Sequence, residues 1–221
     1  MTPVDGGAGP AGEALIVEKH PRAIRWAHWV NFPLLALMVW SGLLIYWAND
    51  EYWLSIPDPA AEALRLDSRL ALGMGWHFLL MWLFALNGFV YVAYLALSGE
   101  WREIVPDRAC FKEAVEVALH DLRLREAAPP LRGKFNGAQR FAYTGAIAMG
   151  AGSLATGLAI YKPVQAGWLT ALLGGYEAAR REHFLLMLGF VGFFVTHVAQ
   201  VARAGWNNFR AMVAGYEVSS E

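Results

Sequence analysis

Four long apolar stretches constrain this chain more than any other feature of its sequence. None contains Asp, Glu, Lys or Arg, and each is long enough to cross about 30 Å of hydrocarbon, which takes roughly 20 helical residues. Backbone groups at that depth find no water, so helices are the expected spans. The sequence therefore predicts an all-α integral membrane four-helix bundle, with spans at about Trp26 to Trp47, Leu70 to Leu97, Phe141 to Tyr161 and His183 to Val201.

The composition agrees with a bilayer as the solvent and excludes several other classes of protein. Hydrophobic residues make up 57% of the chain and charged residues 17%, which is more apolar surface than a soluble domain of this size buries. A net charge of −1 provides no basic surface for nucleic acid. A single cysteine, Cys110, excludes an internal disulfide, a thiolate-held iron–sulfur cluster and covalently attached c-type haem. Membrane lipid is the expected environment.

Lys and Arg are distributed unevenly over the segments between the spans. Cytoplasmic loops of membrane proteins carry the excess of these residues. Most of the 18 lie before the first span, between the second and third spans, and after the fourth. Both termini are therefore predicted to be cytoplasmic in a bacterial inner membrane. The opposite side holds only Arg65, Arg69, Lys162, Arg180 and Arg181.

The polar segments divide the chain around one membrane domain, predicted to cover residues 19–208. Residues 1–18 are rich in Gly, Ala and Pro and lack the apolar core of a signal peptide, so a disordered tail is expected there. The segment 98–140 is predicted to be a cytoplasmic loop, with a surface helix over Phe111 to Arg125 because apolar residues recur there at helical spacing. Residues 209–221 form the expected C-terminal tail.

A weak internal repeat relates the two halves of the chain. The sequence from Trp40 to Tyr46 closes the first span, and a similar sequence from Ala155 to Tyr161 closes the third. In the same order, His77-Phe-Leu-Leu-Met lies in the second span and His183-Phe-Leu-Leu-Met opens the fourth. Two matches in matching order favour two helical hairpins of similar plan. His77 and His183 are then expected at similar depth.

Four of the six histidines lie within or at the ends of the predicted spans. Ionisable side chains are costly there and usually functional, although a single intramembrane histidine can simply hydrogen-bond across a helix pair. Because four occur together, a functional role is favoured for the set. His20 and His120 lie in polar segments and need no such role. The four are His28, His77, His183 and His197.

The spacing on the last span indicates how the four histidines pair. His183 and His197 are 14 residues apart, which places them within about 40° of one helix face and about 21 Å apart along the axis. Helix direction puts His77 level with His183 and His28 level with His197. Two imidazoles facing each other can ligate a haem iron from both sides, which leaves no open position for substrate and favours electron transfer. Two haem b groups are predicted, with these four histidines as axial ligands to the iron.

The chain resembles the di-haem b-type cytochrome subunits of nickel–iron hydrogenases, formate dehydrogenases and thiosulfate reductases, a bacterial cytochrome b561-like family. The resemblance covers about His20 to Asn208. It rests on His20-Pro21, on Arg25-Trp26 with His28-Trp29 and Asn31, on Ser41-Gly42-Leu43, on His77 and on the histidine pair of the last span. It implies the same ligand pairs, His28 with His197 and His77 with His183.

The stretch from Lys134 to Arg140, Lys-Phe-Asn-Gly-Ala-Gln-Arg, is similar to the family's quinone-site stretch. The resemblance implies that Asn136 and Gln139 border a quinone, ubiquinone or menaquinone, near the cytoplasmic-side haem. Without the family context the same residues are a polar helix start, with Asn136 as its cap.

The predicted function is transmembrane electron transfer between the quinone pool and a peripheral oxidoreductase. The partner implied by the resemblance is a hydrogenase, a formate dehydrogenase or a periplasmic molybdopterin enzyme, and this chain is its electron-transfer subunit rather than a self-sufficient catalyst. One alternative is a small b561 cytochrome that oxidises superoxide and reduces quinone, which a cationic cluster including Arg180 and Arg181 would favour. Another is a histidine-based metal or proton transporter, although the spans lack the carboxylates of such a relay.

Overall fold

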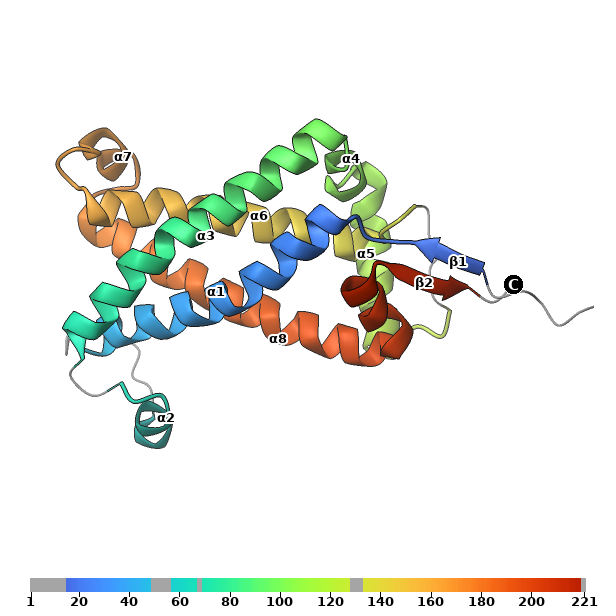
Figure 1. The fold of residues 1–221 in the computed structure, drawn as a ribbon, viewed down its shortest axis with the longest axis horizontal. Coiled ribbons are helices and arrows are strands. Elements are labelled where there is room, and N and C mark those ends of the chain that lie inside the picture. The colour runs from blue at the N-terminus through green and yellow to red at the C-terminus, as the bar shows by residue number, and fades with distance from the viewer. Residues whose placement is uncertain (1–14, 49–56, 67–68, 128–132, 220–221) are drawn as a thin grey trace, which may run out of the picture.

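Four long helices make up most of the molecule, which is described here from a computed structural model that covers residues 15–48, 57–66, 69–127 and 133–219. All four are long and apolar enough to cross a membrane, and Figure 1 shows them running along the long axis of the molecule. The predicted fold class, an all-α membrane bundle of four helices, is confirmed. The four helices are α1 (Arg22–Trp47), α3 (Leu70–Ser98), α6 (Gly137–Tyr161) and α8 (Tyr176–Ala214).

The four helices form two hairpins, α1 with α3 and α6 with α8, and most interhelical packing lies within a hairpin. Small residues permit the close approach, as is usual between membrane helices. A Cβ atom on Gly73 would lie 2.7 Å from the Cβ of Leu44, and one on Gly189 would lie 2.8 Å from the Sδ of Met149. The two hairpins of similar plan therefore match the internal repeat of the sequence.

Helix α3 shows how the outer surface of the bundle suits lipid. Leu79, Trp82, Leu86 and Phe89 recur at helical spacing and are 58–73% exposed. A soluble protein rarely leaves so continuous an apolar stripe in water. Hydrocarbon is the solvent that matches this face.

Short elements cover the two ends of the bundle (Figure 1). The end called the far end here carries α2 (Asp58–Ala63), after α1, and α7 (Gly167–Leu172), between α6 and α8. The opposite end, called the strand end, carries α4 (Trp101–Ile104), α5 (Arg108–Asp121) and a two-stranded antiparallel sheet of β1 (Leu15–Glu18) and β2 (Tyr216–Ser219). The sheet joins the two ends of the described chain, so both lie on one side of the bundle.

The sheet corrects the expectation that residues 1–18 form a disordered tail. Residues 15–18 are strand β1, which pairs with β2 so that Leu15 lies opposite Ser219 and Glu18 opposite Tyr216. Residues 1–14 lie outside the described part of the chain. The expected start of the C-terminal tail at residue 209 also falls inside a helix, because α8 continues to Ala214. The strand was missed because its partner is about 200 residues away in sequence, beyond the reach of local patterns.

The surface helix expected over 111–125 begins and ends earlier than predicted. Helix α5 starts at Arg108 because the carboxylate of Asp107 accepts hydrogen bonds from the backbone N–H groups of Ala109 and Cys110, at 2.9 and 3.0 Å. It ends at Asp121, and Arg123 then has a φ of 60°. That left-handed conformation is incompatible with a continued helix.

Helix α8 bends sharply at Gly205, whose φ of 81° and ψ of −178° are not helical. A positive φ of this kind is accessible mainly to glycine. Beyond the bend, residues 206–219 return to the start of α1; this segment is called the C-terminal latch below. Arg25 donates to the carbonyl of Val213 at 2.7 Å, and the indole N–H of Trp29 donates to the carbonyl of Met212 at 3.1 Å.

Candidate haem sites

The structure brings the four span histidines together as two facing pairs. At the far end, the ring centres of His77 on α3 and His183 on α8 are 6.2 Å apart. At the strand end, those of His28 on α1 and His197 on α8 are 6.0 Å apart. These are called the far-end pair and the strand-end pair. Each pair joins helices from different hairpins, and α8 contributes one imidazole to both.

The separation of the rings fits two axial ligands on one iron. With metal–nitrogen bonds of about 2 Å and ring centres about 1 Å behind the bonded nitrogens, two imidazoles on opposite sides of a metal lie about 6 Å apart. Both pairs match that distance. Neutral imidazole is a usual ligand of haem iron, and filling both axial positions leaves a centre for electron transfer.

The far-end imidazoles are each held by a hydroxyl from the other helix of the same hairpin. The Oγ of Ser41 on α1 lies 3.0 Å from the Nδ1 of His77, and the Oγ1 of Thr156 on α6 lies 2.9 Å from the Nδ1 of His183. Ligating histidines in proteins usually have such a partner on the second ring nitrogen, which orients the ring. The remaining nitrogen of each ring is then available to a metal.

The strand-end pair is surrounded mainly by aromatic rings. His28 makes an edge contact with Trp29 at 5.1 Å, and His197 stacks on Phe193 at 5.8 Å. Within the described part of the chain, the buried Nδ1 of His28 has no hydrogen-bond partner. Among the described residues, this ring therefore has no counterpart of the hydroxyls that support the far-end imidazoles. The C-terminal latch closes this end, since Phe209 contacts Trp29 at 6.2 Å.

The internal repeat explains why the strand end has one histidine pair rather than two. The offset that places Ser41 on Thr156 places His28 on Tyr143, and the offset that places His77 on His183 relates Tyr91 to His197. The counterpart of each strand-end histidine in the other hairpin is therefore a tyrosine. The histidines of the strand-end pair therefore have no histidine counterparts, and the repeat is broken at this end.

Asn136 and Gln139 form a reciprocal cap at the start of α6. The side-chain oxygen of Asn136 accepts from the N–H of Gln139 at 2.9 Å, and that of Gln139 accepts from the N–H of Asn136 at 3.0 Å. This is a capping box, which satisfies two backbone donors at a helix start. The alternative role considered for this stretch, a polar helix start with Asn136 as its cap, is therefore confirmed. Their amide NH₂ groups are not used by the cap, so a role as donors to a quinone stays a prediction.

Aromatic side chains gather beside this cap. Phe135 stacks on His20 at 6.2 Å and makes an edge contact with Tyr143 at 5.0 Å. Lys134 forms an ion pair of 2.9 Å with Glu100. Burial, followed by the positive charges of Lys134 and Lys19, lowers the pKa of His20 to about 4, so its imidazole is neutral at physiological pH. His20, expected in a polar segment without a role, is instead part of this cluster.

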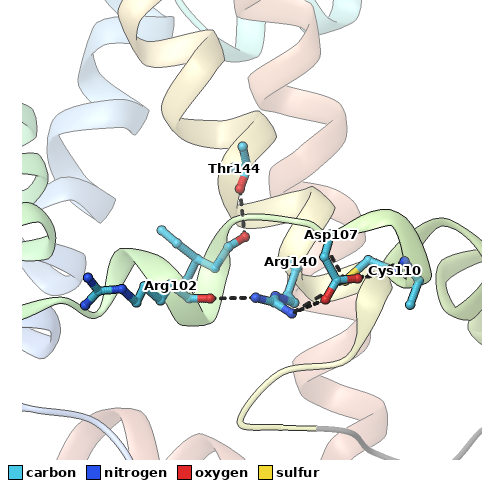
Figure 2. A network of polar contacts seen from close by, with 7 residues as sticks. Arg102, Asp107, Cys110, Arg140 and Thr144 are labelled. Carbon is cyan, nitrogen blue, oxygen red and sulfur yellow. Dashed lines mark hydrogen bonds and ion pairs between the residues drawn. The ribbon is translucent and has the colours of Figure 1, made fainter.

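Arg140 fastens the loop helices to α6 (Figure 2). One terminal nitrogen donates to the carbonyl of Arg102 at 2.6 Å. The other lies 3.6 Å from both the Asp107 carboxylate and the Sγ of Cys110. Nearby, the hydroxyl of Thr144 donates to the carbonyl of Ile104 at 2.8 Å. The arginine at the end of the quinone-like stretch therefore holds α4 and α5 in place.

Sequence reasoning missed three of these roles. Ser41 and Thr156 occupy equivalent places in the repeat. Each is a hydroxyl residue followed by glycine, and that common pattern was the signal available. The role of Arg140 had no such signal, because its partners are backbone and side-chain atoms about 30 to 40 residues earlier.

Comparison with known proteins found a similar protein and a matching family model. A relative from Azospira oryzae (strain ATCC BAA-33 / DSM 13638 / PS), named putative protein-methionine-sulfoxide reductase subunit YedZ1, is 36% identical over 184 residues, which cover 83% of this chain and 89% of that protein. The model of the prokaryotic cytochrome b561 family matches residues 19–215. The resemblance expected from the sequence is thereby confirmed. This chain belongs to the prokaryotic cytochrome b561 family and is a multi-pass protein of the bacterial inner membrane that transfers electrons through haem.

Proposed function

We propose that this protein passes electrons from the quinone pool at the strand end to a peripheral oxidoreductase at the far end, using one b haem at each histidine pair. The observation that supports this most directly is the presence of two facing pairs with bis-imidazole separation. Their two members on α8 are about 21 Å apart along the helix, so the pairs lie toward opposite membrane surfaces. Haem in such a site supplies one-electron transfer.

The strand end is proposed to face the cytoplasm. It holds both ends of the described chain, together with α4 and α5, which lie between α3 and α6 in the sequence. Most of the 18 Lys and Arg lie in these segments, and the positive-inside rule places them in the cytoplasm. A fluorescent-protein fusion that matures only in the cytoplasm, attached to the C-terminus, tests this assignment. Fluorescence is expected, and its absence in well-expressed protein would reverse the orientation.

The quinone is proposed to bind near the start of α6. The amide NH₂ groups of Asn136 and Gln139 are donors suited to a quinone carbonyl, and Phe135 and Tyr143 offer apolar ring faces beside them. His20, which stacks on Phe135, lies just before α1, the helix that carries His28, so this cluster is at the same end of the bundle as the strand-end pair.

The partner is proposed to be a reductase of protein methionine sulfoxide, the activity in the name of the Azospira relative. Reducing a methionine sulfoxide to methionine requires two electrons and two protons and releases water. A quinol supplies two electrons, so the direction of flow would be from quinol to sulfoxide. This choice replaces hydrogenase and formate dehydrogenase as the preferred partners. The superoxide alternative is not preferred, because Arg180, one of the two arginines named for its cationic cluster, is paired with Glu177 at 3.4 Å.

The first experiment is a haem count on protein purified in mild detergent. We expect two b haems per chain by pyridine haemochrome, and about one in each of His183→Ala and His28→Ala. A reduced quinol analogue should reduce both haems of the wild type, and the sulfoxide reductase with an oxidised protein substrate should reoxidise them. Correctly inserted protein without haem would refute the proposal. Two haems that quinol does not reduce would refute its quinone part.

A further inference from the structure

We propose that Ser41 and Thr156 are positioning residues for the far-end pair. Their hydroxyls fix the tautomer of His77 and His183 and lower the reduction potential of the haem held between them. This inference rests on the proposed ligand role of that pair.

The hydroxyls of Ser41 and Thr156 have one hydrogen each to donate. The Oγ of Ser41 lies 3.1 Å from the carbonyl of Met38, and the Oγ1 of Thr156 lies 2.8 Å from the carbonyl of Gly152. A carbonyl oxygen only accepts, so each hydroxyl hydrogen is engaged there.

With the hydroxyl hydrogens on these carbonyls, we assign each imidazole as the donor to its hydroxyl. The ring hydrogen is thus assigned to the Nδ1 atoms of His77 and His183, which lie 3.0 and 2.9 Å from the hydroxyl oxygens. In a neutral imidazole the other nitrogen then has a free lone pair. Each Nε2 is left as a ligand, with the partner ring 6.2 Å away between ring centres.

The same arrangement occurs once in each hairpin. Glycine follows both hydroxyl residues, and it lies against the imidazole that the hydroxyl binds. A Cβ on Gly42 would be 3.4 Å from the Cε1 of His77, and one on Gly157 would be 3.3 Å from the Cε1 of His183. The hydroxyl and glycine together set the position of the ring from its own hairpin. Repetition at equivalent positions argues against a chance contact.

A hydrogen bond from Nδ1 makes the imidazole a more basic ligand. A more basic axial ligand stabilises ferric over ferrous iron, and second-shell hydrogen bonding is one of the means by which proteins tune haem potential. The Nδ1 of His28 at the strand end has no such partner among the described residues. Removing the hydroxyls should therefore raise the potential of the far-end haem alone.

The test compares variants with and without the hydroxyl. Ser41→Ala and Thr156→Val, singly and together, remove it, whereas Ser41→Thr and Thr156→Ser keep it. Thr196→Val is a matched control on α8, because that hydroxyl donates to the carbonyl of Gly192 at 2.9 Å rather than to an imidazole. Redox titration of the purified protein and the ferric low-spin EPR signals are the readouts. His183→Ala identifies which component belongs to the far end.

In the double variant we expect the far-end midpoint potential and EPR g values to shift, with the strand-end component unchanged. The hydroxyl-keeping variants and the Thr196 control should match the wild type. Selective loss of the far-end haem, with its retention in the hydroxyl-keeping variants, would also support the inference. An unchanged far-end potential at full haem content would overturn it, as would equal shifts in both sets of variants. A wild type without two haems would instead refute the proposed function.

Discussion

The far-end and strand-end pairs place two imidazoles at nearly the same separation, 6.2 and 6.0 Å between ring centres, by different means. At the far end each imidazole is held within its own hairpin, by Ser41 for His77 and by Thr156 for His183. At the strand end His28 has aromatic neighbours, and its Nδ1 has no partner among the residues that the structure describes.

The two sites differ in how far apart in sequence the contacting residues lie. At the far end the hydroxyl and the imidazole that it contacts are 36 and 27 residues apart, within one hairpin. At the strand end the C-terminal latch reaches α1 through hydrogen bonds across more than 180 residues. The far-end site therefore depends on single side chains, whereas the strand-end site depends on closure of the whole chain.

Deleting the C-terminal latch should affect the strand-end site and leave the far-end site intact. A chain ending at Ala204 loses the partners of Arg25 and Trp29, so His28 is no longer held toward His197. We expect haem content to fall from two to about one per chain, with the far-end spectrum retained. Haemochrome counting and redox titration measure this. A chain shortened only by Ser220 and Glu221 is the control, and equal haem in both truncations would contradict the role of the latch.

Gly157→Ala should disturb the far-end site alone. The new Cβ would lie 3.3 Å from the Cε1 of His183, closer than most carbon contacts, so the ring must move. We expect partial loss of the far-end haem or a clear change in its EPR signal. Gly145→Ala on the same helix meets nothing within 4 Å and should behave as wild type. Similar effects from both variants would mean that α6 tolerates no alanine in general.

Asn136→Asp and Gln139→Glu separate the cap of α6 from the proposed quinone contact. Each keeps the oxygen that accepts in the capping box but removes the NH₂ donor. We expect quinol-driven haem reduction to slow about tenfold for one lost hydrogen bond of roughly 1.4 kcal/mol. Melting temperature and haem content should stay at wild-type values. Asn136→Ala should instead cost about 1 kcal/mol of helix stability. Unchanged rates in both acidic variants would remove these residues from the quinone site.

Arg140→Gln should loosen the loop helices without loss of haem. It removes the bonds to the Arg102 carbonyl, Asp107 and Cys110, which we expect to cost about 1–3 kcal/mol. Thermal unfolding and protease cleavage within residues 98–140 report the change. Arg125→Gln, which breaks a more exposed pair with Glu116 at 3.1 Å, should cost at most about 1 kcal/mol. An effect of Arg140→Gln no larger than that of the control would contradict the role of Arg140 in holding α4 and α5.

A pH dependence of stability is expected at the strand end. The pKa of His20 falls from 6.5 to about 4 because of burial and then the charges of Lys134 and Lys19. Between these values the unfolded chain binds a proton that the folded chain does not, so stability declines as pH falls from about 6.5 toward 4. His20→Gln should flatten that slope in thermal denaturation measured from pH 4 to 7.5. His120→Gln is the control, and an unaltered slope in His20→Gln would contradict the assignment.

The sequence by itself determined the four membrane helices and the level of each histidine. Span length and the absence of charge are local properties, and a bilayer leaves the backbone no alternative to helix. The spacing of His183 and His197 placed both on one face of α8 by helical geometry alone. The repeat indicated two hairpins, which the packing of α1 with α3 and of α6 with α8 confirms.

Only the tertiary structure decided how these local elements support one another. It paired β1 with β2, bent α8 at Gly205 and brought Arg140 to α4 and α5. It also showed that Asn136 and Gln139 cap α6, and that two hydroxyls bind the far-end imidazoles. These contacts join residues distant in sequence, and a hydrogen bond forms only when packing brings donor and acceptor to about 3 Å in suitable orientation. Periodicity along one helix carries no information about that distance.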